Sequence, residues 1–541
     1  MATGTSTPYL DAIKNYAPNS QRAPAKKNQD PKELLSKFHP DYAIDSSTRL
    51  QVGANKSEPC HPQLATLLQS KSPISNTDII HATTFVATNE TDVLIIGGGG
   101  AGCAAALEAS RAGANVILAT KLRLGDSNTV MAEGGIQAAI NPNDSPQAHF
   151  DDSYKGGHKL GDTELIKQLA LSGPETIHWL IQQGMQFTTD DNGEIRTRRA
   201  GGSSADRVVY FQDYTGLELM RTLRESITNT PNIDVQEYSP AIELLSNDQG
   251  HCAGAVFMSV DDKKRSIIKA KTVIIATGGL GQLHLNNFST SNHLGATGDG
   301  LVLAYRLGAK LRDLDSFQYH PTGLAYPYSL AGSLISESIR SAGTQLVNAH
   351  GQRFIDELAP RDVVAAAIIR ECKEGRGITA DGGKVGVWLD TPSLEQRSPN
   401  ILKQQFPKLI RLGEKSGINP TQTPLLIYPT LHYQNGGISI NENGETSVKN
   451  LYSAGETSGG LHGRNRLMGN ALLEIISFGR RAGKHAAQQR HNAINNNVSL
   501  QHLAKFNDTL AKTNLPQNIT GPLLFPDETG FQFPSAPNIN S

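Results

Sequence analysis

An apolar run that closes on four glycines divides the chain near Thr91. The stretch TDVLIIGGGGAGCAAALEASRAGANVILATK contains an apolar strand, a glycine turn, an alanine-rich helix and a second apolar strand. This order is one βαβ unit, the building block of a parallel sheet. The pattern therefore predicts that an α/β domain begins at about residue 91.

The first 90 residues have a different character, because they are polar and dotted with proline. Only Pro31–Phe38 and residues 61–70 show apolar residues at helical spacing. Such a segment is equally compatible with a poorly ordered tail and with a docking arm.

Two further short strands end in glycines, in KAKTVIIATGGLG and in VKNLYSAGETSGG. The block between them has its own mixture of helical and strand patterns, so we expect an inserted second domain. After Arg481 only a short helix and an irregular tail are predicted. The expected parts are an N-terminal extension 1–90, a first domain formed by 91–328 and 431–487, an inserted domain 329–430 and a tail 488–541.

The composition argues against nucleic-acid binding, a disulfide framework and a membrane-spanning segment. Lys and Arg number 50 against 51 Asp and Glu, so no overall charge would draw the chain to nucleic acid or to an anionic membrane. The 4 cysteines are far apart, which fits neither a disulfide framework nor a metal-ligand spacing. No stretch approaches the roughly 20 apolar residues that span a bilayer, and the N-terminus has no signal-peptide pattern. We expect a cytoplasmic protein with no direct membrane insertion and no metal site.

Gly97, Gly99 and Gly102 form a GxGxxG pattern directly after the first strand. In a dinucleotide site the first glycine makes the tight turn, the second lets the pyrophosphate approach, and the third lets the helix pack on the strand. The second strand ends in Thr120 and Lys121, where a carboxylate for the ribose is usual. A hydroxyl and an ammonium would therefore take that role.

Two other segments suit flat and anionic ligands. The loop GDSNTVMAEGGIQAAI carries the pair Gly134 and Gly135, which lets backbone lie against a flat ring. The segment GLHGRNRLMGNALLE sets Arg464 and Arg466 two positions apart. Because a guanidinium offers a planar fork of donors, this segment predicts recognition of a carboxylate or another anion.

Seven motifs occur in one order, and together they resemble one family. They are GxGxxG, the GGI loop, ATGG at 276–279, TGDG at 297–300, YHPTG at 319–323, SAGE at 453–456 and the HGxNR run. This order is similar to that of the flavoprotein subunits of succinate dehydrogenases and fumarate reductases, with L-aspartate oxidase as a close cousin. The resemblance covers roughly residues 91–488. It implies FAD, an α/β Rossmann-like FAD-binding domain of the glutathione-reductase type, an inserted α+β capping domain that closes over the substrate, and a short C-terminal helical tail.

The resemblance also implies the cofactor contacts. Many members carry a histidine, covalently bonded to the flavin, where this chain has Asn128, so we expect non-covalent FAD and a tilt towards fumarate reduction. Ala471 stands where the family has a serine contact. The flavin contacts carried over are Gly97, Gly99, Gly102, Lys121, Asn128, Thr129, Gly134, Gly135, Asp299, Glu456 and the chain near Asn470 and Leu472.

The substrate implied is a small dicarboxylate. By resemblance Arg466 clamps its carboxylate, helped by His432, His320 and Ser336, while Arg361 donates the proton and Glu337 restores it. A normal arginine hardly loses its proton, so such a relay is required. Arg340 is a nearby cation without an assigned role. Arg464 stands for the family's alanine and would share a face with Arg466 if the local chain were strand-like.

Three other functions stay open on the sequence. An L-aspartate oxidase would need a carboxylate for the substrate ammonium, and Ala200 occupies the matching position. A non-catalytic assembly subunit would not need the complete set of site residues. Steroid and urocanate reductases share the fold, but the paired arginines and two histidines favour a small dicarboxylate.

Electrons must reach the flavin from another protein, because the chain has no cysteine cluster and no CxxCH haem motif. The family implies that the donor is an iron–sulfur subunit. The N-terminal arm is a candidate for docking that donor, and any membrane attachment would be peripheral, through partners.

Overall fold

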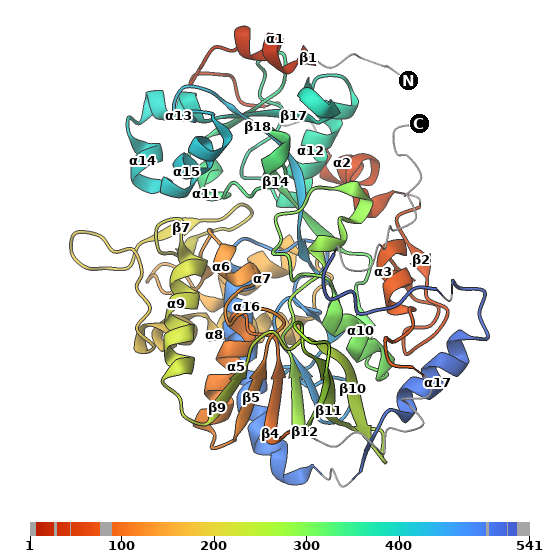
Figure 1. The fold of residues 1–541 in the computed structure, drawn as a ribbon. Coiled ribbons are helices and arrows are strands. Elements are labelled where there is room, and N and C mark those ends of the chain that lie inside the picture. Colours follow the sequence, from red (N-terminus) through yellow and green to blue (C-terminus); the bar gives the residue numbers. More distant parts are fainter. Residues whose placement is uncertain are drawn as a thin grey trace.

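The computed structural model of the chain describes residues 7–25, 30–43, 45–75, 89–493, 497–516 and 518–526. Within these ranges the lower part of the molecule in Figure 1 is built on a sheet of eight strands. Its order is β22-β10-β11-β12-β4-β5-β9, with β20 beside β12. Those strands are β4 (Asn89–Ile96), β5 (Val116–Ala119), β9 (Ile233–Gln236), β10 (Ala241–Asn247), β11 (Cys252–Met258), β12 (Arg265–Ile275), β20 (Leu451–Ser453) and β22 (Val498–Ser499).

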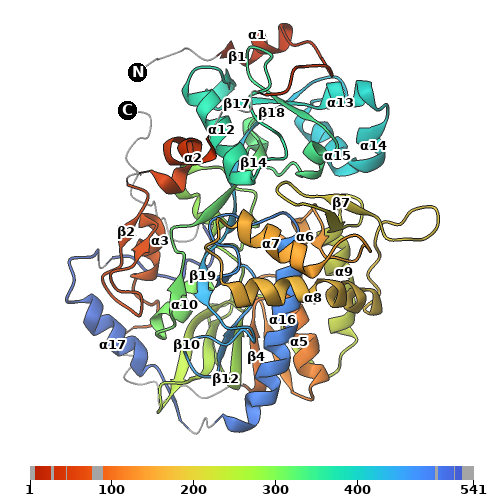
Figure 2. The same ribbon diagram turned by 180° about the vertical axis from the view of Figure 1, so that it is seen from behind.

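The predicted βαβ unit is confirmed. β4 and β5 are parallel and are joined by α5 (Gly100–Arg111), and both predicted later strands, β12 and β20, join the same sheet in parallel. The long helix α16 (Asn470–Gln489) runs beside α5 behind the sheet (Figure 2). Small residues permit this contact, because a Cβ at Gly483 would lie 2.1 Å from the Ala105 carbonyl oxygen.

Other helices and small sheets surround this sheet and complete the lower domain. The helices are α3 (Pro62–Leu68), α6 (Asn128–Met131), α7 (Pro146–Gly156), α8 (Thr163–Gln182), α9 (Thr215–Thr228), α10 (Asp299–Arg306) and α17 (Gln501–Leu510). The remaining strands are β2 (Thr48–Arg49), β3 (Pro59–Cys60), β6 (Ile136–Gln137), β7 (Thr197–Arg199), β8 (Asp206–Val209), β13 (Leu311–Arg312), β19 (Gly437–Ser439) and β21 (Ser458–Gly459).

A second domain, here called the cap, forms the upper part of Figure 1. Its sheet has the order β1-β16-β17-β18-β14, with β15 beside β17. The strands are β1 (Thr7–Pro8), β14 (Phe317–Leu324), β15 (Gln345–Val347), β16 (Ile378–Thr379), β17 (Val385–Asp390) and β18 (Leu425–Gln434). Its helices are α11 (Ser338–Ser341), α12 (Arg361–Lys373), α13 (Thr391–Arg397), α14 (Ile401–Gln405) and α15 (Pro407–Ser416).

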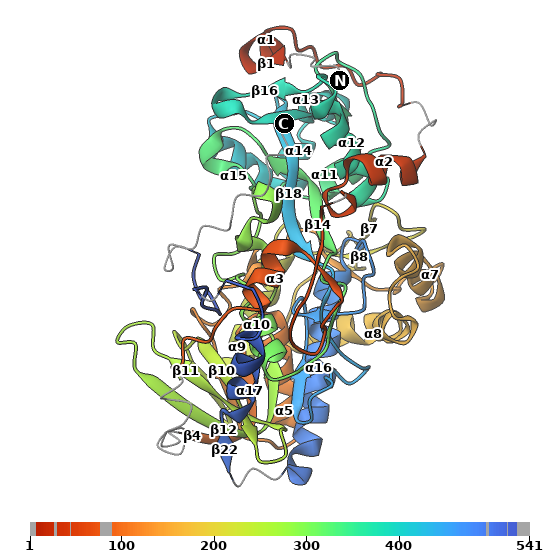
Figure 3. The same cartoon turned by 90° about the vertical axis from the view of Figure 1, so that its right-hand side faces the viewer.

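The antiparallel pair β14 and β18 runs from the cap down into the lower domain (Figure 3). The expected boundary at residues 430 and 431 falls inside β18. The boundaries of the parts therefore stay predictions. The pair, whose register shifts near His320, carries residues of the cap sheet into the space between the domains.

The described part of the N-terminal extension is packed on the rest of the chain, so of the two alternatives a poorly ordered tail does not describe these residues. Strand β1 pairs with β16, and the Tyr9 ring on α1 (Tyr9–Lys14) lies 5.5 Å from that of Trp388. Helix α2 (Pro31–Phe38) spans the predicted residues and buries two leucines in the cap core. Helix α3 is shorter than predicted and is buried in the lower domain. The extension thus ties the cap to the lower domain (Figure 3).

The C-terminal part contains the predicted short helix, α17, and returns to the lower domain. Leu523 and Leu524 are buried there. Among the described residues, no helix is both long and apolar enough to cross a membrane.

Candidate functional site

A cavity of about 590 Å³ lies between the cap and the lower domain. Both domains line it, and most of the predicted residues meet there. They are Gly97, Gly99, Lys121, Asn128, Thr129, Gly134, Gly135, Asp299, Glu456 and Leu472 of the expected cofactor set, with His320, Ser336, Glu337, Arg361, His432 and Arg466 of the expected substrate set. Gly102 and Asn470 do not line it, although Gly469 and Ala471 do.

The glycine turn has the geometry that a pyrophosphate requires. Gly97 has φ +120, and a Cβ there would lie 2.2 Å from the Ala276 carbonyl oxygen. A Cβ on Gly102 would lie 1.8 Å from the Gly97 carbonyl oxygen, so this glycine lets α5 pack on the turn. Gly99 caps α5 without a side-chain hydrogen bond. The first-turn N–H groups of a helix are anion donors, so this end of the cavity fits a dinucleotide phosphate.

Asn128 lies in a hydrogen-bonded network at the cavity wall. Its Nδ2 donates to Asn292 Oδ1 at 2.7 Å and to Glu456 Oε2 at 3.1 Å, and its Oδ1 accepts from the His293 N–H at 2.6 Å. Burial raises the pKa of Glu456 to about 7. Asn470 lies behind the cavity wall, where its side chain forms hydrogen bonds with His149 Nε2 and Ser153 Oγ.

The Lys121 ammonium already has three hydrogen-bond acceptors from the protein. Its Nζ donates to Asp299 Oδ2 at 2.6 Å, to Thr297 Oγ1 at 2.8 Å and to the Leu524 carbonyl at 2.5 Å. The C-terminal segment therefore supplies an acceptor at this end of the cavity. That this ammonium takes the role of the usual ribose carboxylate stays a prediction. The Leu524 carbonyl is an acceptor of Lys121 that the sequence did not indicate.

Arg466 is a buried cation with donors to spare. Its Nη2 donates to Gln318 Oε1 at 2.9 Å, and its guanidinium lies 4.1 Å from the Tyr433 ring centroid. The Nε group is buried and has no hydrogen-bond partner in the described structure. Burial, with the charge of Arg361, lowers the pKa of Arg466 to about 10, which still leaves it charged at neutral pH. An unpaired buried donor on a cation is costly, so the arrangement favours a bound anion.

Arg361 begins helix α12 and faces the same point. Its Nε donates to Glu337 Oε2 at 2.6 Å and its Nη1 to Gln318 Oε1 at 2.8 Å. Burial alone would raise the pKa of Glu337, but the charges of Arg361 and Arg340 outweigh it and lower that pKa to about 2. Glu337 is therefore a fixed carboxylate between two guanidinium groups. Arg340, on its other side, donates to the same oxygen at 3.2 Å.

Gln318 joins the two site arginines and was missed from the sequence. Its Oε1 accepts from both Arg361 and Arg466, while its Nε2 donates to the Arg466 carbonyl at 2.7 Å. Gln318 precedes His320 by two positions on β14. Since residues i and i+2 of a strand share a face, that spacing was a usable signal.

The two histidines are side by side and neutral. The ring centroids of His320 and His432 are 5.0 Å apart. Burial, together with the surrounding arginines, holds the pKa of each well below its usual range. The His432 Nδ1 atom is 2.7 Å from Ser291 Oγ, and the Ser336 hydroxyl lies near Ser338 Oγ at 3.1 Å. Neutral imidazoles of this kind can orient a substrate by hydrogen bonds.

Arg464 does not join this group. The local chain is a turn rather than a strand, and Arg464 is absent from the cavity lining. Its guanidinium donates to Asp315 Oδ2 at 2.9 Å and to the Asp315 carbonyl at 3.0 Å. The condition for a face shared with Arg466 is therefore not met. Over the described ranges, no group of three or more His, Cys, Asp or Glu could hold a metal ion.

Comparison with known proteins gives one family model, FAD binding domain, over residues 92–472. An uncharacterized FAD-dependent oxidoreductase of Methanocaldococcus jannaschii is 39% identical, and the match covers 76% of this chain and 75% of that protein. A CoM/CoB fumarate reductase subunit of Methanothermobacter marburgensis is 38% identical, over 74% of this chain and 73% of the other. An L-aspartate oxidase of Nostoc is 37% identical, over 72% and 67%.

Solved structures agree with this result. A variant of FrdA from the quinol fumarate reductase of E. coli superposes with a TM-score of 0.72 at 31% identity. The match covers 79% of this chain and 74% of that one.

Proposed function

The chain belongs to the FAD-binding oxidoreductase family that contains fumarate reductase flavoprotein subunits and L-aspartate oxidases, and from this we propose that it is an FAD-dependent oxidoreductase that interconverts fumarate and succinate, working as a fumarate reductase. One observation carries the choice of substrate. Arg361 and Arg466 converge on Gln318 in a cavity that the glycine turn and the Gly134–Gly135 loop also line. Two buried cations at one point suit a small dicarboxylate.

In this proposal the substrate carboxylates are held by Arg466, with His432, His320 and the Ser336 hydroxyl as neutral donors. Reduced FAD, which the glycine turn and the Gly134–Gly135 loop would hold, would supply a hydride for one alkene carbon. Arg361 donates a proton to the other carbon and is reprotonated through Glu337, which accepts from Arg361 Nε. Because Glu337 is ionised at rest, the proton that it passes on must first reach it from solvent. The charges of Arg361 and Arg466 also stabilise the negative charge that develops on the substrate.

Non-covalent FAD is part of the proposal, because the Asn128 amide has no ring nitrogen and its polar atoms are engaged with protein groups. We expect acid precipitation of the purified protein to release all of its flavin into the supernatant, and gel bands of the denatured chain to show no flavin fluorescence. The measurement is the ratio of absorbance in supernatant and pellet. Flavin that stays with the pellet would contradict this part of the proposal.

An L-aspartate oxidase is the second candidate, since such oxidases are among the relatives. Ala200 argues against it. The side chain is buried against Val208 and Met468, and it offers no acceptor for a substrate ammonium. The next residue, Gly201, donates its N–H to Glu337 Oε1 at 2.7 Å, so this segment supports the relay instead. The charged cavity also disfavours a steroid, and its complete residue set disfavours a non-catalytic assembly subunit.

The electron donor is proposed to be an iron–sulfur subunit. Three of the four cysteines are buried, and all are free thiols placed far from one another in the sequence. One relative is itself named as a subunit of a fumarate reductase, which supports a role within a complex. Peripheral attachment to a membrane would then depend on that complex.

The deciding experiment is anaerobic. We expect the dithionite-reduced flavoprotein to be reoxidised rapidly by fumarate, as followed by flavin absorbance, and the oxidised protein to form no hydrogen peroxide from L-aspartate in air. Peroxide and loss of aspartate, without reoxidation by fumarate, would transfer the protein to the oxidase class.

A further inference from the structure

Glu133 is a buried carboxylate that the proposed reaction does not use. It is 5% exposed and directly precedes the Gly134–Gly135 pair of the expected flavin loop. Burial raises the pKa of Glu133, so the ionised form needs partners. The cation that pairs with the carboxylate comes from the cap, while Arg198 of the lower domain donates to the Glu133 carbonyl at 3.3 Å.

The first partner is Lys408, at the start of helix α15. Its Nζ lies 2.7 Å from Glu133 Oε1 and donates to the Met131 carbonyl at 3.2 Å. Its backbone N–H donates to Asp213 Oδ2 at 2.8 Å. Both ends of this one cap residue are therefore tied to the lower domain.

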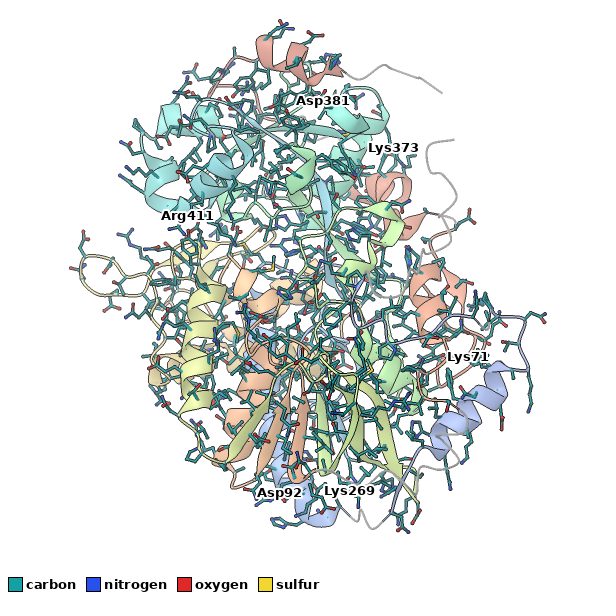
Figure 4. All side chains as sticks on the ribbon, viewed as in Figure 1. Lys71, Asp92, Lys269, Lys373, Asp381 and Arg411 are labelled. Carbon is teal, nitrogen blue, oxygen red and sulfur yellow. The ribbon has the colours of Figure 1, made fainter. Side chains whose placement is uncertain are left out.

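One turn further along α15, the Arg411 guanidinium lies 5.7 Å from the centroid of the Tyr214 ring. Figure 4 labels Arg411 at the lower edge of the cap, where it meets the lower domain. In Figure 1 this edge is on the side of the molecule away from α2. The cap thus contacts the lower domain at α15 as well as through β14 and β18, and residues of α15 line the cavity.

The backbone of Ser336 also acts on the same carboxylate, because together with Lys408 it lowers the pKa that burial raises. Ser336 and Glu337 belong to the proposed substrate and proton-relay residues. Glu133, Lys408 and Ser336 all line the cavity. One carboxylate therefore joins the flavin loop, the cap helix and the relay segment.

We propose that the Glu133–Lys408 pair is the latch that holds α15 on the flavin loop, and that Glu133 is a positioning residue that fixes the Ser336–Glu337 segment for substrate binding. This inference rests on the proposed function for its substrate readout. Removing Lys408 leaves the Glu133 carboxylate buried without its cation, which costs more than the loss of a surface pair. Removing Glu133 leaves Lys408, which is 37% exposed, without the carboxylate that holds it on the flavin loop. The consequence is a looser cap edge and a misplaced Ser336, with the chemical step itself less affected.

The test uses Glu133→Ala, Glu133→Gln, Lys408→Met and the Glu133→Ala/Lys408→Met double variant in the FAD-loaded chain. Lys403→Met, an exposed lysine of α14, is the control. We expect Glu133→Ala to raise KM for fumarate about tenfold with a smaller change in kcat. Glu133→Gln keeps a polar oxygen beside the Ser336 backbone and should restore part of the loss. The double variant should be no worse than Glu133→Ala, because coupled partners are not additive.

Amide hydrogen exchange supplies a readout that needs no substrate. In Glu133→Ala and Lys408→Met, with or without FAD, exchange of amides in 408–416 and 131–135 should accelerate about tenfold, while Lys403→Met matches the parent. Unchanged exchange and unchanged KM in both variants would overturn the latch. If fumarate fails to reoxidise even the parent protein, the proposed function falls and exchange alone decides the latch. Lys408 is 37% exposed, so its variant keeps the test valid if Glu133→Ala misfolds.

Discussion

Replacing Arg361 with glutamine is expected to lower kcat for fumarate reduction by about four orders of magnitude, because the variant loses both the general acid and a cation at the developing charge. The neutral amide cannot protonate carbon. The chain should still fold, since Glu337 keeps the Gly201 N–H at 2.7 Å and Arg340 Nη2 at 3.2 Å as partners. Flavin reoxidation by fumarate, followed by stopped flow, measures the change.

Arg397→Gln is the matched control for this variant, because Arg397 is a cap arginine whose guanidinium donates to the exposed Gly343 carbonyl at 2.9 Å. It should react like the parent. FAD content and thermal unfolding separate a chemical defect from a folding defect. If Arg361→Gln keeps its FAD and reduces fumarate within tenfold of the parent, the proton comes from another group.

Arg466→Ala is expected to lower kcat/KM for fumarate by about a thousandfold, chiefly through a higher KM, since truncating one partner of a buried charge pair costs several kcal/mol. The variant also removes the donor to Gln318 and the cation over the Tyr433 ring. Steady-state kinetics across fumarate concentrations give the division between KM and kcat.

Arg466→Lys distinguishes the charge from the shape of this group. Lysine keeps the charge but lacks the planar fork that can bond Gln318 and a carboxylate together, so it should recover less than a tenth of the lost kcat/KM. A variant with alanine that binds fumarate as the parent does would exclude Arg466 from the carboxylate site.

The local parts of this molecule could be predicted because they depend on neighbouring residues. The βαβ unit follows from an apolar run, glycines and an alanine-rich helix, and α2 begins and ends where its apolar spacing indicates. Most of the candidate site residues also line one cavity, although their roles stay predictions.

The remainder depended on contacts between distant segments, for which periodicity carries no signal. Arg22 pairs with Asp390, 368 positions away, and Leu524 reaches Lys121 across 403 positions. Glu133 is unremarkable in its loop until Lys408 is placed opposite it. The condition for Arg464 and Arg466 to share a face is not met, because the local chain is a turn rather than a strand.

The N-terminal extension has a consequence for biosynthesis. Strand β1 leaves the ribosome well before the strand that it pairs with, β16, which is made about 370 residues later; at ordinary translation speeds this is a delay on the order of half a minute. Until then Tyr9 and the helix behind it have no surface to cover, and the outer edge of β16 has no partner. The cap therefore cannot mature as an independent unit during synthesis, because one of its strands comes from a segment made long before the others.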